Sequence, residues 1–309
     1  MTQTSTQATD LRDKYGAEAF EAGLQFQPKE FERRIALRDS LDQYFTKLRL
    51  DFATLGMYSR AVLDLRTRFL VLIGQFTMVK NGQALEDTIR GAIAAKVPPK
   101  DILEIILQCV IYGGDNAVDP ALDIFGRVAE ECGLLAELRA SQLPLDGHDR
   151  ERSLDQERAS WIHEDTNDPR REALMAKHGW LAVSTGMRLR PKHHLDVLEY
   201  FDRLDEHFTN IWVKFCYQGM YTRGVIDDKT RLLCMVGDCM AIGEAVQGRS
   251  HMRGAMRAGA TPREVMEVIL LSCINFGMPA IVQGLKIFVT LMAEQGRLDE
   301  IGDPPGPVE

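Results

Sequence analysis

The residue types best suited to chemistry lie close together at Glu244, Gln247 and His251. If this segment is helical, the spacing of three and four residues puts their side chains on one face. A histidine can exchange protons near neutral pH, and a carboxylate one or two turns away can orient its imidazole or raise its pKa. This arrangement makes His251 and Glu244 a candidate catalytic pair, with Gln247 as a candidate substrate-binding neighbour. The alternative is a histidine that only packs in a core or an interface.

Two arginines, Arg60 and Arg223, occur in similar surroundings, each two residues after a tyrosine. A guanidinium group binds a carboxylate through two parallel hydrogen bonds. We therefore expect Arg223, its neighbour Tyr221 and Arg60 to bind an anionic substrate. A structural interpretation has equal weight, because Asp64 and Asp227 follow four residues later, which is the spacing of an ion pair on a helix.

An internal repeat relates the two halves of the chain without a gap, with Gly56 matching Gly219. The segments GMYSR at 56–60 and GMYTR at 219–223 match, as do the RGA segments at 90–92 and 253–255. Each unit, of about 125 residues, is long enough to bury a core of its own. The sequence predicts a first unit at residues 11–135 and a second unit at 174–298, joined by a charged connector at 136–173. A flexible N-terminus at 1–10 and a flexible tail at 299–309 flank them.

The two units differ at the positions that carry the predicted chemistry. In the first unit, the counterparts of Glu244, Gln247 and His251 are Asn81, Ala84 and Thr88. We therefore expect the second unit to keep the acid–base group, while the first shapes a pocket or supports assembly. The alternative is that the first unit uses Asp87 in a different way.

The hydrophobic periodicity predicts an all-α fold of about six helices per unit. Residues 101–111 and 264–274 are apolar at helical spacing. Thr261, Pro262 and Glu264 form a capping-box pattern with proline at the first helical position, and Asp64 and Asp227 each precede an apolar stretch that they could cap. We find no convincing alternation of the kind that a strand requires.

Several segments resemble the carboxymuconolactone decarboxylase family. They are YSRAVLDLRTR at 58–68, HMRGAMRAG at 251–259, and the segments IYGG at 111–114 and FGMPA at 276–280. The resemblance implies two tandem copies of the all-helical alkylhydroperoxidase-D-like fold, which assembles into rings of subunits. It also implies a catalytic histidine at His251. The thiol peroxidases of this fold need two cysteines, and Glu244 and Gln247 stand at those positions, so we expect no thiol peroxidase activity.

The resemblance favours a carbon–carbon lyase that decarboxylates a small carboxylated lactone or a related ring-cleavage product. Such a reaction needs donors that stabilise an enolate and an acid that returns a proton. No cofactor or metal is implied, and no metal-binding or phosphate-loop motif appears. The alternatives are a cofactor-free isomerase, hydrolase or dehydratase on a related metabolite, or a non-catalytic assembly or binding subunit.

Composition limits the partners. The net charge of −8 and the aromatic content of 7% disfavour nucleic-acid binding. No apolar run approaches about 20 residues, residues 1–11 do not resemble a signal peptide, and the six cysteines are scattered. We expect a cytoplasmic protein that binds a small carboxylate and no membrane, and that forms a homo-oligomer, a trimer before a dimer. His193 and His194 lack a partner at metal-ligand spacing and are expected at the surface.

Overall fold

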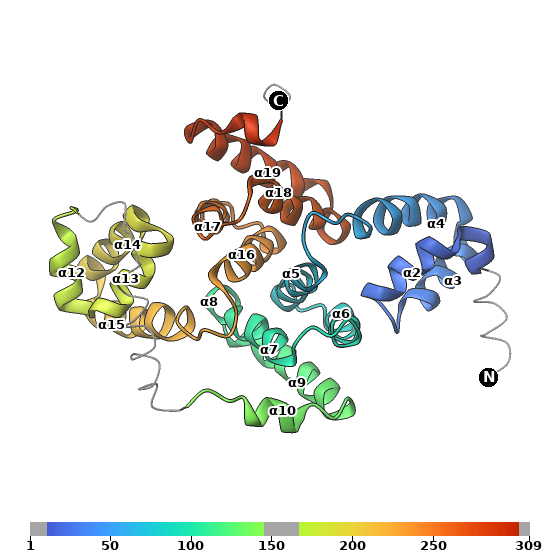
Figure 1. The fold of residues 1–309 in the computed structure, drawn as a ribbon, viewed down its shortest axis with the longest axis horizontal. Helices are drawn as coiled ribbons and strands as arrows, with labels where there is room; N and C mark the ends of the chain where they lie inside the picture. The colour runs from blue at the N-terminus through green and yellow to red at the C-terminus, as the bar shows by residue number, and fades with distance from the viewer. Residues whose placement is uncertain (1–10, 145–166, 303–309) are drawn as a thin grey trace.

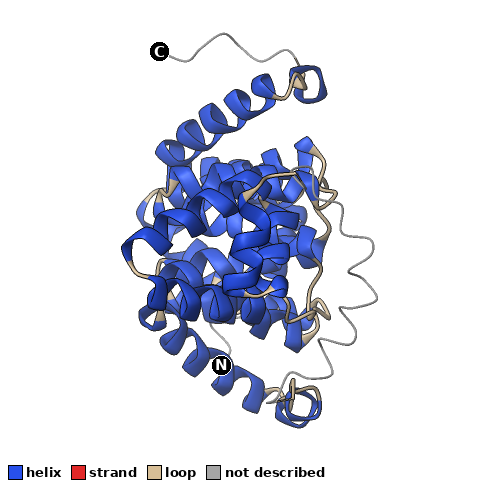
Figure 2. Cartoon of the chain, turned by 90° about the vertical axis from the view of Figure 1, so that its left-hand side faces the viewer, coloured by secondary structure: helices blue, strands red, loops and turns tan. Residues whose placement is uncertain are grey.

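The computed structural model describes residues 11–144 and 167–302, and every regular element within these ranges is helical (Figures 1 and 2). The predicted all-α fold is therefore confirmed. Residues 1–10, 145–166 and 303–309, which include much of the expected connector and tail, lie outside the described ranges.

The first half contains α2 (Ala17–Phe26), α3 (Phe31–Leu41), α4 (Gln43–Arg49), the π-helix η1 (Leu50–Tyr58), α5 (Leu65–Met78), α6 (Gly82–Ala94), α7 (Pro99–Gln108), α8 (Val110–Gly113), α9 (Asp115–Glu131) and α10 (Leu135–Ala140). The second half contains α12 (Arg170–His178), α13 (Trp180–Leu189), α14 (Pro191–Leu204), α15 (Glu206–Val213), the π-helix η2 (Lys214–Met220), α16 (Asp228–Ile242), α17 (Ala245–Arg257), α18 (Pro262–Leu271), α19 (Cys273–Glu294) and the 3₁₀-helix η3 (Leu298–Ile301).

The sequence repeat is also a repeat of structure. Helices α5, α6 and α7 begin at positions that correspond to the first residues of α16, α17 and α18, and each half has a π-helix at the equivalent place. Gly114 separates α8 from α9 with φ of 60°, and its counterpart Gly277 bends α19 with φ of 72°. Glycine suits both positions because positive φ is costly for other residues.

The predicted helix caps are confirmed. The Asp64 carboxylate accepts the Thr67 backbone N–H at 2.9 Å, and Asp227 does the same for Thr230. Thr261 forms a complete capping box at the start of α18. The apolar helices predicted at 101–111 and 264–274 are shorter than expected. Each is interrupted, at Cys109 and Ser272, where the chain turns into α8 or α19 and where no glycine or proline signals a break.

The two halves share one hydrophobic core, and its centre is the packing of α5 against α16 (Figure 1). Gly74 and its counterpart Gly237 allow the close approach. A Cβ atom on Gly74 would lie 2.3 Å from Asp238 Oδ1, and one on Gly237 would lie 2.9 Å from Val71 Cγ1. Both distances are too short for real contacts, so the crossing depends on these two glycines.

Helices α2–α4 and α12–α15 extend to opposite sides of this core in Figure 1. Each side exposes a row of large apolar residues at matching positions of the repeat. The row in the first half is Leu37, Leu41, Phe45, Leu48 and Phe52, and the row in the second half is Tyr200, Leu204, Phe208, Ile211 and Phe215. We call these the apolar rows. A contiguous exposed apolar surface of this kind is typical of an interaction site.

Helix α19 corrects the expectation that no apolar segment is long enough to cross a membrane. By length and composition alone, Cys273–Glu294 reaches that limit. The element is not one straight helix, however, because Gly277 has non-helical backbone angles and Pro279 follows it. Its two parts correspond to α8 and α9 of the first half.

Candidate active site

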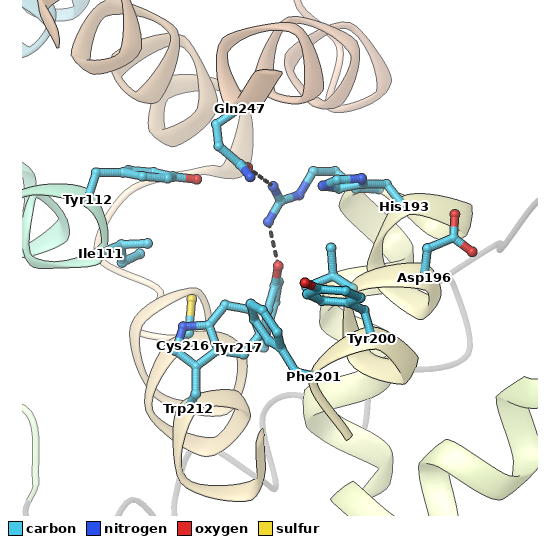
Figure 3. A pocket seen from close by; sticks show the side chains of 12 residues that line it. Ile111, Tyr112, His193, Asp196, Tyr200, Phe201, Trp212, Cys216, Tyr217 and Gln247 are labelled. Carbon is cyan, nitrogen blue, oxygen red and sulfur yellow. Dashed lines mark hydrogen bonds between the residues drawn. The ribbon is translucent and has the colours of Figure 1, made fainter. Parts of the chain in front are cut away.

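A pocket of about 350 Å³ lies where α8 of the first half meets α14, α15, η2 and α17 of the second (Figure 3). Its lining is mostly apolar and aromatic, with a few polar groups. The residues used in the argument below are Tyr112, Arg190, His193, Phe201, Trp212, Cys216, Tyr217 and Gln247. Because Tyr112 and the others come from different halves, the pocket exists only when the two halves are packed together.

Arg190 supplies a fixed positive charge in the pocket. It is the residue that precedes α14, its side chain is 5% exposed, and it donates hydrogen bonds to the Tyr217 hydroxyl and, at 3.2 Å, to Gln247 Oε1. Figure 3 marks these two bonds as dashed lines. The Arg190 Nε has no partner among the described residues. A guanidinium group that lines a pocket is suited to bind a carboxylate or a developing oxyanion.

The Tyr112 hydroxyl and His251 Nε2 form a hydrogen bond that joins the two halves. His251 is fully buried, and its pKa is well below the usual value because burial, Arg190 and His193 all disfavour the imidazolium. Burial likewise raises the pKa of Tyr112 well above its usual value. The pair is therefore neutral at rest, with the Tyr112 hydroxyl facing the pocket and His251 behind it.

Aromatic rings form the wall opposite Tyr112. Phe201 and Trp212 meet edge to face with ring centroids 5.3 Å apart, and Trp212 meets Tyr217 in the same way at 5.4 Å. Tyr217 in turn stacks on Tyr221 at 5.2 Å. Such a wall can hold a flat unsaturated ring against the polar groups.

Cys216 also lines the pocket, but its thiol is poorly suited to be a nucleophile. Burial raises the Cys216 pKa to about 12, so the thiol stays protonated near neutral pH. Within the described ranges, all six cysteines are free, and no group of three or more histidine, cysteine or acidic residues could hold a metal ion.

The predicted pair of His251 and Glu244 does not form. Glu244 precedes the first turn of α17 and accepts the backbone N–H groups of Val246 and Gln247, at 3.0 and 3.2 Å. The spacing predicts a shared helical face, but Glu244 is the N-cap residue of α17, and an N-cap side chain bonds to the end of its own helix. Tyr112 takes the place that Glu244 was expected to fill.

The two predicted anchor arginines bind carboxylates of the protein instead of lining the pocket. Arg223 Nε donates to Glu104 at 2.8 Å, and Arg60 bonds to Glu267 through two nitrogens. These pairs occupy equivalent positions and join the two halves. The structural interpretation of these arginines was therefore closer, although the partners differ from Asp64 and Asp227, which cap helices.

Two other predicted residues lie at or behind the pocket. Gln247 lines it and holds Arg190, while Tyr221 is buried behind Tyr217 with its hydroxyl on Met235 Sδ at 3.2 Å. His193 is half-buried and lines the pocket, whereas His194 is fully buried, so the prediction of a surface position was wrong for His194.

Sequence reasoning missed Arg190, Tyr217 and the role of Tyr112. Tyr112 stands in one of the segments that carry the family resemblance, so a signal was present there. Arg190 is followed by a proline that starts α14, but nothing in the local pattern shows that its side chain turns inward. A buried arginine becomes recognisable only from the elements that pack around it.

The geometry defines an all-helical protein in which a tyrosine–histidine hydrogen bond and a buried arginine meet at one pocket. The profile of the carboxymuconolactone decarboxylase family matches residues 206–289, within the predicted second unit. Over 77 residues, the chain is 35% identical to an uncharacterised 15.0 kDa protein from the nqo9–nqo10 intergenic region of Paracoccus denitrificans. Over 92 residues, it is 28% identical to 4-carboxymuconolactone decarboxylase of Acinetobacter baylyi.

These alignments cover 24% and 30% of this chain. They span 58% of the length of the Paracoccus protein and 69% of the Acinetobacter enzyme. The matched region 206–289 contains Tyr217, Gln247 and His251, whereas Tyr112 and Arg190 lie outside it.

Proposed function

We propose that the protein is a cofactor-free lyase that decarboxylates a small, unsaturated, carboxylated lactone or a related ring-cleavage product. The observation that carries this proposal is the meeting of Arg190 with the Tyr112–His251 pair at one aromatic pocket. A pocket that only binds a ligand does not need a buried proton-transfer pair. The similarity to the Acinetobacter decarboxylase supports the reaction class.

The pocket offers one group for each step of this reaction. Arg190 binds an oxygen of the substrate, and the aromatic wall holds the ring so that the carbon–carbon bond to the leaving carboxylate can break. The electron pair moves onto the substrate's own carbonyl, and the guanidinium stabilises the enolate oxygen. Tyr112 then gives its hydroxyl proton to the carbon that lost CO2.

His251 supports Tyr112 in this proposal. With the proton on Nε2, the neutral imidazole donates to the Tyr112 oxygen, which aims the hydroxyl proton at the pocket and stabilises the phenolate that forms. A water molecule restores the Tyr112 proton after the product leaves. Because the pKa of His251 is well below its usual value, an imidazolium is not the source of the proton.

The test is the release of CO2 from a panel of carboxylated lactones, with Tyr112→Phe and His251→Asn compared with the native chain. Loss of a general acid typically lowers the rate about 10²–10⁴-fold, so we expect such a fall in kcat for Tyr112→Phe with an unchanged melting temperature. The matched control is Tyr44→Phe, because Tyr44 is 74% exposed and lies outside the pocket. Full activity in folded Tyr112→Phe would contradict the mechanism.

We also propose that the chain self-associates through the apolar rows. A trimer is the favoured assembly and a dimer is the second choice. Each row repeats the same five positions on opposite sides of the chain. Two matched surfaces per chain can close a ring when each row meets the other row of the next copy.

A further inference from the structure

The first half has its own pocket, of about 210 Å³, at the place that corresponds to the candidate active site. It lies between α3, α4 and η1, and the start of α19 closes it. We call it the arginine pocket. Each half thus provides most of one pocket, and the other half completes it with Tyr112 in one case and Asn275 in the other.

The repeat shows how the two linings differ, position by position. Three apolar or aromatic residues of the active-site pocket are replaced by arginine: Val197, Phe201 and Trp212 correspond to Arg34, Arg38 and Arg49. The groups of the proposed proton transfer are lost in the same comparison, because Tyr112 and His251 correspond to Asn275 and Thr88. Tyr217, which holds Arg190, corresponds to Thr54. The arginine pocket has gained positive charge and lost the groups that would do acid–base chemistry.

Two of these arginines, Arg38 and Arg49, have no counter-charge bonded to their guanidinium groups within the described residues. The Arg38 guanidinium has no hydrogen-bond or ion-pair partner among the described residues, and the pKa of Arg38 is lowered by burial and by the nearby charges of Arg49 and Arg34. Arg49 donates to the Ile274 carbonyl oxygen at 2.7 Å, which is neutral. A carboxylate, that of Glu30, lies 3.9 Å from Arg34 but is itself bonded to Arg33.

We propose that the arginine pocket binds a small organic dianion whose carboxylate or phosphate oxygens replace the missing counter-charge. Guanidinium groups bind both kinds of oxyanion through paired hydrogen bonds. Three arginines that face one small cavity repel each other, and a bound dianion removes that repulsion. The cavity of about 210 Å³ has room for a small anion only. This site does not depend on the decarboxylase proposal.

Calorimetric titration of the full chain at about 50 mM ionic strength tests the proposal, because higher salt screens such contacts. The probes are the dicarboxylates succinate and malonate and the phosphate monoester methyl phosphate, with neutral succinamide as the control ligand. We expect Arg38→Gln to weaken binding of the preferred anion at least about tenfold, the usual loss for a hydrogen bond to a charged group. The matched control is Arg203→Gln, because Arg203 is exposed in the other half and the change in net charge is the same. Arg203→Gln should bind like the native chain.

A second variant separates the two pockets. Binding that persists in Arg190→Gln and fails in Arg38→Gln supports the arginine pocket, and the preferred probe then distinguishes a carboxylate from a phosphate ligand. Binding that fails in Arg190→Gln and persists in Arg38→Gln assigns the anion to the active-site pocket and overturns the proposal. Equal weakening by Arg38→Gln and Arg203→Gln, or no heat with any of the three anions at about 10 mM, would overturn it as well.

Discussion

Replacement of Glu104 by glutamine tests how the two halves are held together. Glu104 Oε1 lies 2.6 Å from Arg231 Nη2, and both side chains are 1% exposed. Its second oxygen binds Arg223 at 2.8 Å. Glu104→Gln keeps the shape but removes the charge, so the Arg231 guanidinium stays buried without a counter-charge. Breaking a buried pair in this way costs about 3–5 kcal/mol.

The repeat provides the control for this experiment. Glu267 is the counterpart of Glu104 and binds Arg60, whose side chain is 37% exposed. The buried counterpart of Arg231 is Arg68, which donates to the Tyr58 carbonyl oxygen instead. Water can reach Arg60 after Glu267→Gln. We therefore expect a loss of only about 1.5–3 kcal/mol, the usual contribution of a hydrogen bond to a charged group.

The assay is urea unfolding followed by circular dichroism at pH 7, with the same buffer for the native chain and both variants. The free energy of unfolding should fall more for Glu104→Gln than for Glu267→Gln. The slope of that free energy against urea concentration should change little. Equal losses, or a loss below about 1 kcal/mol for Glu104→Gln, would show that burial of Arg231 does not govern the stability of the interface.

Three further predictions concern packing, pH and assembly. Gly74→Ala should lower the free energy of unfolding by about 1–3 kcal/mol, because the new Cβ atom would clash with Asp238. The control is Gly126→Ala, whose Cβ atom would have no neighbour within 4 Å. It should raise the free energy of unfolding, measured by urea titration, by about 0.5–1 kcal/mol. Burial raises the pKa of Asp238 to about 8. Between about pH 4 and pH 8 the carboxyl group ionises in the unfolded chain but stays protonated in the native chain, so the native chain should lose stability as the pH rises. The melting temperature of Asp238→Asn relative to that of the native chain should therefore increase over this range, and a constant difference would contradict a raised pKa. Light scattering after gel filtration should give a mass near three times 34.8 kDa, and a double change of Phe45→Asp and Phe208→Asp should reduce it to that of one chain; an unchanged mass would exclude the apolar rows as the contact.

Much of the fold followed from local signals in the sequence. Asp64, Asp227 and the Thr261 capping box mark helix starts because a cap acts within one turn of its own residue. The repeat also shows that His251 corresponds to Thr88 of the first half. What local signals could not supply was the partner of each polar group. Glu104 lies on α7 and Arg231 on α16, far apart in the sequence, so their contact depends on where the fold places these two helices.

The site was only partly predictable for the same reason. His251 was found, but its partner is a tyrosine from the other half, and the carboxylate on its own helix has a different task. Spacing along a helix describes neighbours within one element, whereas a buried side chain bonds to whatever the neighbouring element brings. Arg190 illustrates this, since its partners Tyr217 and Gln247 come from η2 and α17.

The joining of both units in one chain has a consequence for how the protein can change over generations. If two identical chains formed the same pair of pockets, every substitution would appear in both, and a residue that improved one would alter the other. Here a mutation at position 38 reaches one pocket and leaves position 201 as it was. Covalent linkage thus removes the requirement that both pockets keep the same task, and it fixes the ratio of the two kinds at one to one in every molecule made.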